Sequence, residues 1–371
     1  MSAVVLAGAL AAKPGNGGEA WVRLTWALGL AELGVPVHLV ETADLTPDAP
    51  GVRWFDRVTA WAGLAGRATL LDARGTALAG PGRSVVADLA ADGALLLDLS
   101  GTLRDAPLVA AFRHRAYVDL DPGWTQLWDA AGLLGDALDR YDSHLTVGDA
   151  VARCGLPLSG RRWRSIRPAV LLSAWPAQPA AGPELTTVGS WRSPSGTLTH
   201  SGRELGGKAR PWRALAGLPA QVPQPCAAVV AAHPADAADL DLLTAGGWSL
   251  RDPTSIDHPG SYREFVQHSA GELSVAQQMY TATGCGWTSD RTAAYLASGR
   301  PVVVQDTGAD RDLTGSPAWW TFRTRAEAAA ACRDVAAADP ARLSAAARTL
   351  AEQVFATGVV LPRVLELAGA R

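Results

Sequence analysis

The sequence predicts an α/β protein with two Rossmann-like domains that face a cleft, and three observations support this fold class. The chain has 371 residues, which is long for one domain and suits two of ordinary size. Both halves alternate apolar runs typical of buried strands with segments of helical spacing. A proline-rich stretch separates the halves. We therefore expect domains at residues 1–165 and 185–371, joined by a linker at residues 166–184.

The N-terminal half opens with a strand, a loop, a helix and a second strand. Residues 4–9 form an apolar run, residues 13–18 form a glycine-rich loop, and residues 19–33 carry apolar side chains at helical spacing. Gly34 ends this helix, and the next strand is expected at residues 35–40. Such a unit should form a right-handed parallel crossover. Further strands are expected at residues 94–99, 116–120 and 143–147.

Prolines and a short basic run interrupt this pattern between residues 156 and 183, which is why the domain boundary is placed there. A second series of strands and helices then begins. Its strands are expected at residues 185–188, 226–231 and 302–304, with one helix starting at Ser261 and a mostly helical end at residues 326–370.

The segment at residues 284–308 has the layout of a nucleotide-sugar pocket. Thr288, Ser289 and Asp290 are residue types that cap a helix N-terminus, and a helix of roughly ten residues should follow them. Such a helix points free backbone N–H groups and the positive end of its dipole at whatever lies in front of it. A diphosphate is therefore a natural ligand.

The same segment ends in a strand at a sheet edge where ligands bind. Gly299 and Pro301 stop the helix, and residues 302–304 form an apolar run of the kind buried in a parallel sheet. Asp306 and Thr307 come just after this strand, at the edge where open α/β sheets bind ligands. We therefore count both among the candidate acceptor or loop contacts.

Composition favours a small-molecule ligand. The formal net charge is −3 and the pI is about 6.2, which favours neither nucleic acid nor an anionic membrane surface as a partner. The four cysteines are scattered and lack CxxC spacing, as expected of free thiols in a reducing cytoplasm. No apolar run approaches the roughly 20 residues that span a bilayer, and the apolar start lacks the positive region of a signal peptide. We expect a cytoplasmic protein without a membrane span.

Lysine is rare in this chain. Only Lys13 and Lys208 occur, against thirty-one arginines, and both stand beside glycine clusters. A compact, mobile ammonium beside a flexible backbone could contact a phosphate. Two surface lysines left by chance are the alternative, because lysine is mostly exposed.

The glycine-rich loop near the N-terminus matches a dinucleotide-binding pattern only in part. Residues 15–20 fit GxGxxA, and Glu41 ends the next expected strand. In that fingerprint the first glycine directly follows the strand, whereas residues 10–14 intervene here. We therefore favour a flexible loop over the cleft, in which Glu19 touches a sugar or acts as a base, or else supports the helix dipole. The other candidate contacts in this loop are Asn16, Gly17 and Gly18.

Two aspartates follow a predicted strand in the N-terminal half. Asp119 and Asp121 should share one side of that strand and emerge at its carboxyl end. A carboxylate there could deprotonate an acceptor hydroxyl, as sugar transfer requires. The alternative is a turn carboxylate that caps backbone N–H groups next to Pro122.

A loop before the pocket segment offers one more polar candidate. Glu272 lies near serine and glycine residues and could hold a sugar hydroxyl or a phosphate, whereas the lone His268 fits a hydrogen-bonded structural role better. The sequence contains no HxxxH, HExxH or Cys/His cluster of the kind that binds a metal. We therefore expect no metal ligands and no bound cofactor.

Several of these stretches resemble GT-B-type glycosyltransferases, and more specifically a bacterial group assigned as nucleotide-sugar glycosyltransferases. The similar stretches lie in both halves of the chain, and the last of them is the most specific. They are residues 117–123, 187–191, 271–276 and 289–308.

The resemblance implies that the C-terminal domain holds a nucleotide-diphosphate sugar and the N-terminal domain holds the acceptor, with reaction in the cleft and no bound metal. The residues that would lie near the diphosphate are Gly189, Ser190, Lys208, Ser289, Asp290, Arg291 and Thr292.

The chain departs from the family pattern at the donor site. Residues 285–287 echo the Cys-Gly-Trp of a plant-type donor signature, but Gly284 stands where that signature has histidine. Matching on Pro301 places Gly286 and Ala294 where retaining GT-B enzymes carry paired glutamates. Ribose contact would then come from Asp290 or Glu272, or be lost as in a non-catalytic protein.

These observations lead to one expected function and two alternatives. We expect a metal-independent glycosyltransferase that moves a sugar from a nucleotide-diphosphate donor to a small-molecule acceptor. The fourteen tryptophans would suit an apolar acceptor such as a natural-product aglycone, although they could equally be core residues. A sugar-nucleotide epimerase and a non-catalytic GT-B-like partner protein are the alternatives. The donor base, the acceptor, the stereochemical course and the oligomeric state are left open.

Overall fold

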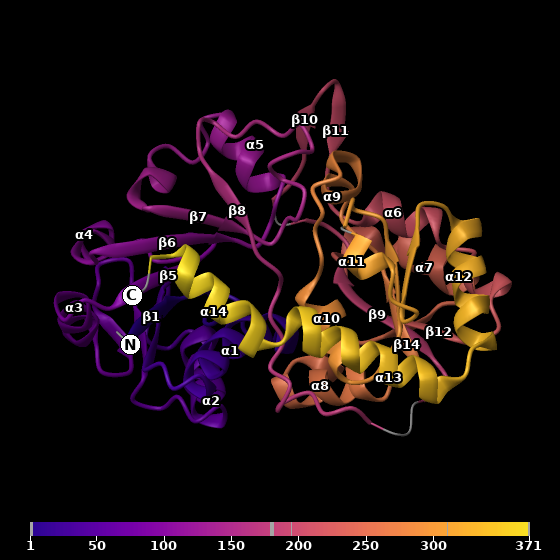
Figure 1. The fold of residues 1–371 in the computed structure, drawn as a ribbon, viewed down its shortest axis with the longest axis horizontal. Helices are drawn as coiled ribbons and strands as arrows, with labels where there is room; N and C mark the ends of the chain where they lie inside the picture. The colour runs from indigo at the N-terminus through magenta and orange to yellow at the C-terminus, as the bar shows by residue number, and fades with distance from the viewer. Residues whose placement is uncertain (1–2, 179–181, 194, 310, 370–371) are drawn as a thin grey trace.

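The computed structural model describes residues 3–178, 182–193, 195–309 and 311–369, which form two α/β units side by side (Figure 1). The first unit has an eight-stranded sheet in the order β4-β3-β2-β1-β5-β6-β7-β8. Its neighbouring strands are parallel except for β3 with β4. The strands are β1 (Val4–Ala7), β2 (Val37–Thr42), β3 (Ala68–Leu71), β4 (Ala77–Ala79), β5 (Leu95–Leu99), β6 (His114–Asp119), β7 (Ser143–Thr146) and β8 (Trp163–Ser165).

The second unit repeats this plan with a six-stranded parallel sheet in the order β13-β12-β9-β14-β15-β16. Its strands are β9 (Leu185–Ser190), β12 (Cys226–Ala231), β13 (Ser249–Arg251), β14 (Gly271–Ser274), β15 (Val302–Gln305) and β16 (Trp319–Phe322). A separate antiparallel hairpin joins β10 (Leu198–His200) to β11 (Arg203–Leu205). In each sheet the first strand lies in the middle and later strands extend to both sides, which is the doubly wound arrangement that the sequence predicts.

Helices cover both sheets. In the first unit they are α1 (Gly17–Glu32), α2 (Pro50–Trp61), α3 (Arg83–Ala91), α4 (Ala106–Ala111), α5 (Trp124–Ala130) and the short η1 (Ala137–Arg140). The later helices are α6 (Ala209–Ala214), η2 (Pro219–Gln221), η3 (Pro234–Asp236), α7 (Ala237–Ala245), η4 (Pro253–Ile256), α8 (Pro259–Gln267), α9 (Gln278–Thr283), α10 (Asp290–Ala297), α11 (Arg311–Thr314), α12 (Arg325–Ala337), α13 (Pro340–Leu350), the π-helical η5 (Ala351–Phe355) and α14 (Thr357–Leu367).

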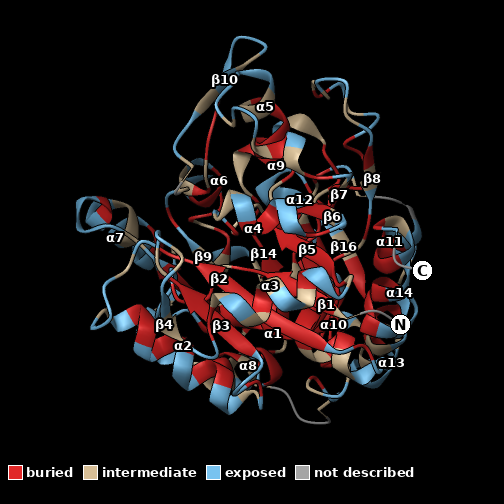
Figure 2. Cartoon of the chain, turned by 90° about the vertical axis from the view of Figure 1, so that its left-hand side faces the viewer, coloured by how far each residue is buried: buried red, intermediate tan, exposed pale blue. Residues whose placement is uncertain are grey.

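The strands lie inside and the polar helix faces lie outside, as Figure 2 shows for the first unit. Every residue of β1 and β5 is buried, including Asp98. Parallel sheets covered on both faces have continuous apolar strands rather than alternating ones. This is why the apolar runs in the sequence locate the central strands well.

The last helix returns to the first unit, although residues 185–371 were expected to form one domain. Helix α14 packs against α1 and lies near β7 (Figure 1). Gly29 permits this close approach, because a Cβ there would come within 2.5 Å of Thr357 Cγ2. The apolar face of α14 indicates that it must pack, but such a face does not specify its partner.

Two chain crossings therefore join the units. The chain leaves the first sheet at Ser165 and enters the second at Leu185, and residues 179–181 of the expected linker lie outside the described residues. The outgoing and returning crossings lie side by side. Val170 N donates to Phe355 O at 2.7 Å, and Thr357 N donates to Val170 O at 3.0 Å.

Candidate active site

A cleft of about 540 Å³ lies between the two units, at the carboxyl ends of the parallel strands of both sheets. On the first wall, Ala9 follows β1, Ser100 follows β5 and Asp121 follows β6. Gly189 and Ser190 lie at the end of β9 on the opposite wall. Open α/β sheets bind ligands at this edge, and a cleft of this volume suits a small molecule. We take it as the candidate active site.

Lys208 places an ammonium on the second-domain wall. The residue is buried, and its Nζ has no hydrogen-bond or ion-pair partner in the part of the chain that the structure describes. A Cβ at Gly189 would lie 3.1 Å from Lys208 Nζ, so the glycine leaves room for the ammonium. Burial, assisted by the Arg291 guanidinium, lowers the pKa of Lys208 to about 7. An anion bound beside it would favour its charged form.

Arg291 also lines the cleft, but its guanidinium holds the second domain together. Its Nε donates to Glu272 Oε1 at 2.6 Å, and its terminal nitrogens donate to Val188 O at 2.6 Å and Ser274 Oγ at 2.9 Å. Glu272 is fully buried and does not line the cleft. The structure thus places Glu272, expected to contact the donor, in the interior as the partner of Arg291.

The N-terminus of α10 faces the cleft as expected. Ser289 caps the helix by accepting a hydrogen bond from Arg291 N at 3.2 Å, and both Ser289 and Asp290 line the cleft. Burial, and then the Glu19 carboxylate on the first wall, raises the pKa of Asp290 to about 6. Thr292 differs from its neighbours, because it lines a small separate cavity rather than the cleft.

A charged cluster on α1 and the preceding loop forms part of the first wall. Lys13 Nζ lies 2.9 Å from Glu19 Oε2, and the buried Arg23 pairs with the same carboxylate. Burial opposes ionisation of Glu19, but Arg23 and then Lys13 outweigh it and lower its pKa to about 2. A carboxylate held ionised in this way is a weak base, so the cluster is better suited to orienting a ligand.

The glycine-rich loop reaches the cleft through only part of its length. Asn16 caps α1 through a hydrogen bond from Glu19 N to its Oδ1 at 3.0 Å, and it lines the cleft together with Gly18. Gly17 does not line the cleft. It packs against the other domain instead, because a Cβ there would come 2.5 Å from His258 O.

The two aspartates after β6 have different positions. Asp119 is fully buried and does not line the cleft. Its Oδ1 accepts from Thr125 Oγ1 at 2.7 Å, and its Oδ2 accepts from Gln126 Nε2 at 2.9 Å and Thr146 Oγ1 at 2.8 Å. This arrangement fits a structural carboxylate better than the catalytic role expected for Asp119. Asp121 alone of the two lines the cleft.

The two walls touch behind the cleft through backbone pairing. Gly148 and Trp287 form an antiparallel bridge, and Ala150 N donates to Cys285 O at 3.0 Å. Gly286 lies inside this contact with φ +75°, and a Cβ there would come 2.7 Å from Ala150 N. Gly286, which the resemblance places at a glutamate position of retaining GT-B enzymes, thus lies in the junction between the domains.

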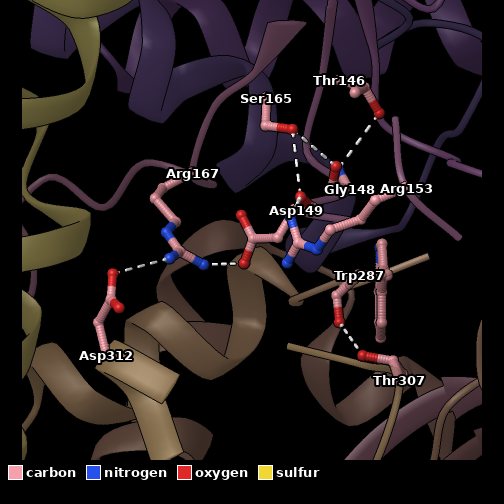
Figure 3. Close-up of polar contacts among 9 residues, drawn as sticks. All are labelled: Thr146, Gly148, Asp149, Arg153, Ser165, Arg167, Trp287, Thr307 and Asp312. Atoms are coloured by element: carbon pink, nitrogen blue, oxygen red, sulfur yellow. Dashed lines mark hydrogen bonds and ion pairs between the residues drawn. The ribbon is translucent and has the colours of Figure 1, made fainter. Parts of the chain in front are cut away.

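Polar side chains reinforce this junction, as Figure 3 shows. Arg167 lies between Asp149, with which it forms an ion pair, and Asp312 of the second unit, whose Oδ2 is 3.4 Å from its Nη2. Ser165 Oγ donates to Gly148 O at 3.0 Å. The linker therefore begins as part of the contact between the domains.

The two residues after β15 lie outside the cleft. Asp306 is ion-paired with the exposed Arg323 at 2.7 Å. Thr307 Oγ1 donates to Trp287 O at 2.6 Å (Figure 3). This bond stabilises the loop at residues 285–287, which contacts the first unit. Neither residue lines the cleft, although both were expected among the acceptor or loop contacts.

Several cleft residues were not predicted from the sequence. Arg23 could have been found, because it lies four residues after Glu19 on the same helix face. Gln277, Tyr280 and Trp287 could not, because they reach the first wall only through the placement of one domain on the other. Of the fourteen tryptophans considered for an apolar acceptor site, Trp26 and Trp287 line the cleft. Three that lie in the first unit, Trp21, Trp26 and Trp124, are buried. Their exposed fractions are 4% for Trp21, 2% for Trp26 and 0% for Trp124.

The described residues contain neither a membrane-spanning helix nor a metal site. No described helix is both long enough and apolar enough to cross a bilayer. No group of three or more His, Cys, Asp or Glu side chains among these residues could hold a metal ion.

The two doubly wound sheets, the cleft between their carboxyl edges and the helix that returns to the first unit define a GT-B fold. No family model matches the chain, and no curated protein matches its sequence.

Three solved structures share this fold over nearly the whole chain. Anabaena Alr3699/HepE in complex with UDP and glucose has 12% identity and a TM-score of 0.61, with 100% of each chain covered. An alpha-glucosyltransferase in complex with UDP and a 13-mer DNA has 10% identity and a TM-score of 0.61, with 99% of each chain covered. The pneumococcal O-GlcNAc transferase GtfA in complex with UDP and GlcNAc has 9% identity and a TM-score of 0.58, covering 99% of this chain and 98% of that one. They confirm the expected GT-B fold.

Proposed function

We propose that this protein is a glycosyltransferase that uses a nucleotide-diphosphate sugar, with a UDP-sugar as the first donor to test. The observation that carries the proposal is that the buried Lys208 ammonium, which has no partner among the described residues, lies with the N-terminus of α10 on one wall of the cleft. A diphosphate fits both features. Similar folds have been solved with UDP bound, which supports the same choice of donor.

The donor contacts follow from this placement. Gly189, Ser190 and Ser289 line the wall beside Lys208 and would surround the diphosphate with backbone N–H and hydroxyl groups. As the bond to the sugar breaks, negative charge grows on the leaving diphosphate. Preorganised donors and the ammonium would stabilise that charge. Asp290 is the carboxylate left to accept a hydrogen bond from a donor hydroxyl, because Glu272 is buried with Arg291.

The acceptor would bind on the first wall, where Asp121 is the best candidate for the base. Its carboxylate lies in the cleft, and burial raises its pKa above the ordinary value. A raised pKa makes a carboxylate a better base near neutral pH. We propose a small-molecule acceptor, because a net charge of −3 gives little attraction for DNA. All four cysteines are free thiols, which fits a cytoplasmic location.

The test is nucleoside-diphosphate release from a panel of nucleotide sugars, with and without pooled hydroxyl acceptors. We expect release that requires an acceptor, together with a product whose mass has increased by one sugar. Conversion of the donor sugar without release would support the epimerase instead. Nucleotide binding without any turnover would support a non-catalytic protein, and failure to bind any nucleotide would reject the donor site itself.

A further inference from the structure

Tyr280 and Gln277 connect the second domain to Asp121 by a chain of hydrogen bonds with one direction. Trp124 Nε1 donates to Gln277 Oε1 at 2.9 Å. Gln277 Nε2 donates to Tyr280 Oη at 3.0 Å, and Tyr280 Oη donates to Asp121 Oδ1 at 2.8 Å. An indole N–H can only donate, so it fixes the orientation of the glutamine amide. The tyrosine then accepts from Gln277, which leaves its single proton for Asp121.

This series of hydrogen bonds crosses the domain boundary twice. Trp124 and Asp121 belong to the first unit, whereas Gln277 and Tyr280 lie at the start of α9 in the second. Tyr280 is 1% exposed and stacks on Trp287 with ring centroids 4.4 Å apart. Trp287 is itself bridged to the first unit. The hydroxyl is therefore held in place by the same contacts that hold the two domains together.

The hydrogen bond from Tyr280 determines which carboxylate oxygen of Asp121 is available to accept a proton. Oδ1 is occupied by Tyr280, and Oδ2 has no hydrogen-bond partner among the described residues. Burial raises the pKa of Asp121, and the Tyr280 hydrogen bond lowers it. The other charged groups that act on this carboxyl are Glu19, which also raises the pKa, and Lys13 and Arg23, which lower it.

We propose that Tyr280 is a positioning residue that holds the Asp121 carboxylate ionised and turns its free oxygen towards the acceptor when the domains are together. The proposal rests on the proposed function. It adds that one domain carries the base and the other domain sets its orientation. Asp121 would then be correctly oriented only in the arrangement that also brings the two substrates together.

Tyr280→Phe tests this, because it removes one hydroxyl and keeps the ring on Trp287. We expect kcat to fall on the order of tenfold, because a poorly oriented base loses part of the rate enhancement that a general base gives. The KM for the donor should not change. The acidic limb of the kcat profile should move to higher pH, because the ionised carboxylate has lost a donor. Tyr141→Phe is the matched control, since Tyr141 Oη donates to the buried Asp98 at 2.7 Å outside the cleft. It should leave the profile unchanged.

A titration of the Asp121 carboxyl by carbon-13 NMR separates this proposal from the proposed function. The resonance is identified by its loss in Asp121→Asn, and its pKa should be higher in Tyr280→Phe than in the wild type. If the wild type transfers no sugar but this pKa rises, the positioning role stands and the transferase assignment falls. An unchanged pKa overturns the proposal, as does an unchanged pH profile.

Gln277→Leu is the second variant if Tyr280→Phe does not fold. It keeps Tyr280 and Asp121 but removes the amide that fixes the direction of the tyrosine proton. We expect the Asp121 pKa to rise in this variant as well, but by less than in Tyr280→Phe. An unchanged Asp121 pKa in this variant would also count against the three hydrogen bonds acting as a unit.

Discussion

Arg291 Nε lies 2.6 Å from Glu272 Oε1, and both side chains are buried, with Arg291 in the cleft wall and Glu272 behind it. Removing one partner of a buried ion pair leaves an uncompensated charge, which typically costs about 3–5 kcal/mol. We therefore expect Arg291→Ala to lower the free energy of unfolding by about that amount. Urea unfolding followed by circular dichroism measures this loss. Arg363→Ala, which breaks an exposed pair with Glu366, should have little effect.

The same pair changes how a nucleotide-binding defect at Arg291 should be interpreted. The sequence suggested a direct contact with the diphosphate, whereas the structure gives Arg291 three partners inside its own domain. A loss of nucleotide affinity in Arg291→Ala would therefore reflect destabilisation of the second-domain wall of the cleft. A variant of full stability that still loses affinity would restore the direct role.

Lys208→Met should weaken binding of the nucleoside diphosphate by about ten- to a hundredfold, because one charge-assisted contact to a phosphate is lost. Binding of the nucleoside without phosphates should not change. Isothermal titration calorimetry with both ligands measures the difference. Arg210→Ala, two residues away and exposed, is the charge-matched control. Equal losses in the two variants would point to general electrostatic attraction.

The lowered pKa of Lys208 also predicts how nucleotide affinity depends on pH. Burial brings this pKa to about 7, so much of the free protein carries a neutral lysine above that pH. A bound diphosphate favours the ammonium and raises the pKa, so binding takes up a proton. Affinity should be full below pH 7 and should fall as the pH rises above it. Calorimetry in two buffers of different ionisation enthalpy detects this uptake, and Lys208→Met should abolish it.

The sequence predicted the fold well because its signals are local. Continuous apolar runs mark strands buried on both faces, and glycine and proline mark where helices stop. The N-terminus of α10 was found in this way, since Ser289 is a good capping residue. Helix α14 shows the limit, because an apolar helix face does not indicate which unit it will pack against.

The side chains of the site were harder to predict for the same reason. Strand periodicity placed Asp119 and Asp121 on one side, but β6 ends at Asp119 and the alternation stops there. Glu272 looked like a loop residue and instead lies in β14, where it is buried. The hydrogen bond from Tyr280 to Asp121 depends on the placement of two domains, which local patterns do not record.

Asparagine at the two aspartates should separate catalysis from stability. Asp121→Asn removes the proposed base and should lower kcat at least about a hundredfold with little change in stability. Asp119→Asn should instead lower the free energy of unfolding by about 1–3 kcal/mol, because an amide N–H₂ would face donors that need an acceptor. Activity assays and thermal unfolding of both variants give the comparison. The opposite pattern would return the catalytic role to Asp119.

Gly286 explains why a glutamate cannot occupy this position without changing the structure. Its φ is +75°, and a Cβ would come 2.7 Å from Ala150 N and 2.9 Å from Asp149 Cβ, so any side chain must push Asp149 and Ala150 away. We expect Gly286→Ala to lower the free energy of unfolding by about 1–3 kcal/mol, and small-angle scattering should show a larger radius of gyration. Gly284→Ala is the matched control, since Gly284 has φ +61° and a Cβ there would meet no atom within 4 Å.

The difference between these two glycine variants isolates the contact between the domains. Both carry the backbone cost of a left-handed residue, but only Gly286→Ala also separates the paired loops. Gly286→Glu should therefore loosen the domains further and gain no transferase activity, although it introduces the residue type that the resemblance to retaining GT-B enzymes implies at this position. A gain of activity in Gly286→Glu would mean that the junction opens during turnover and that a side chain is tolerated at this position.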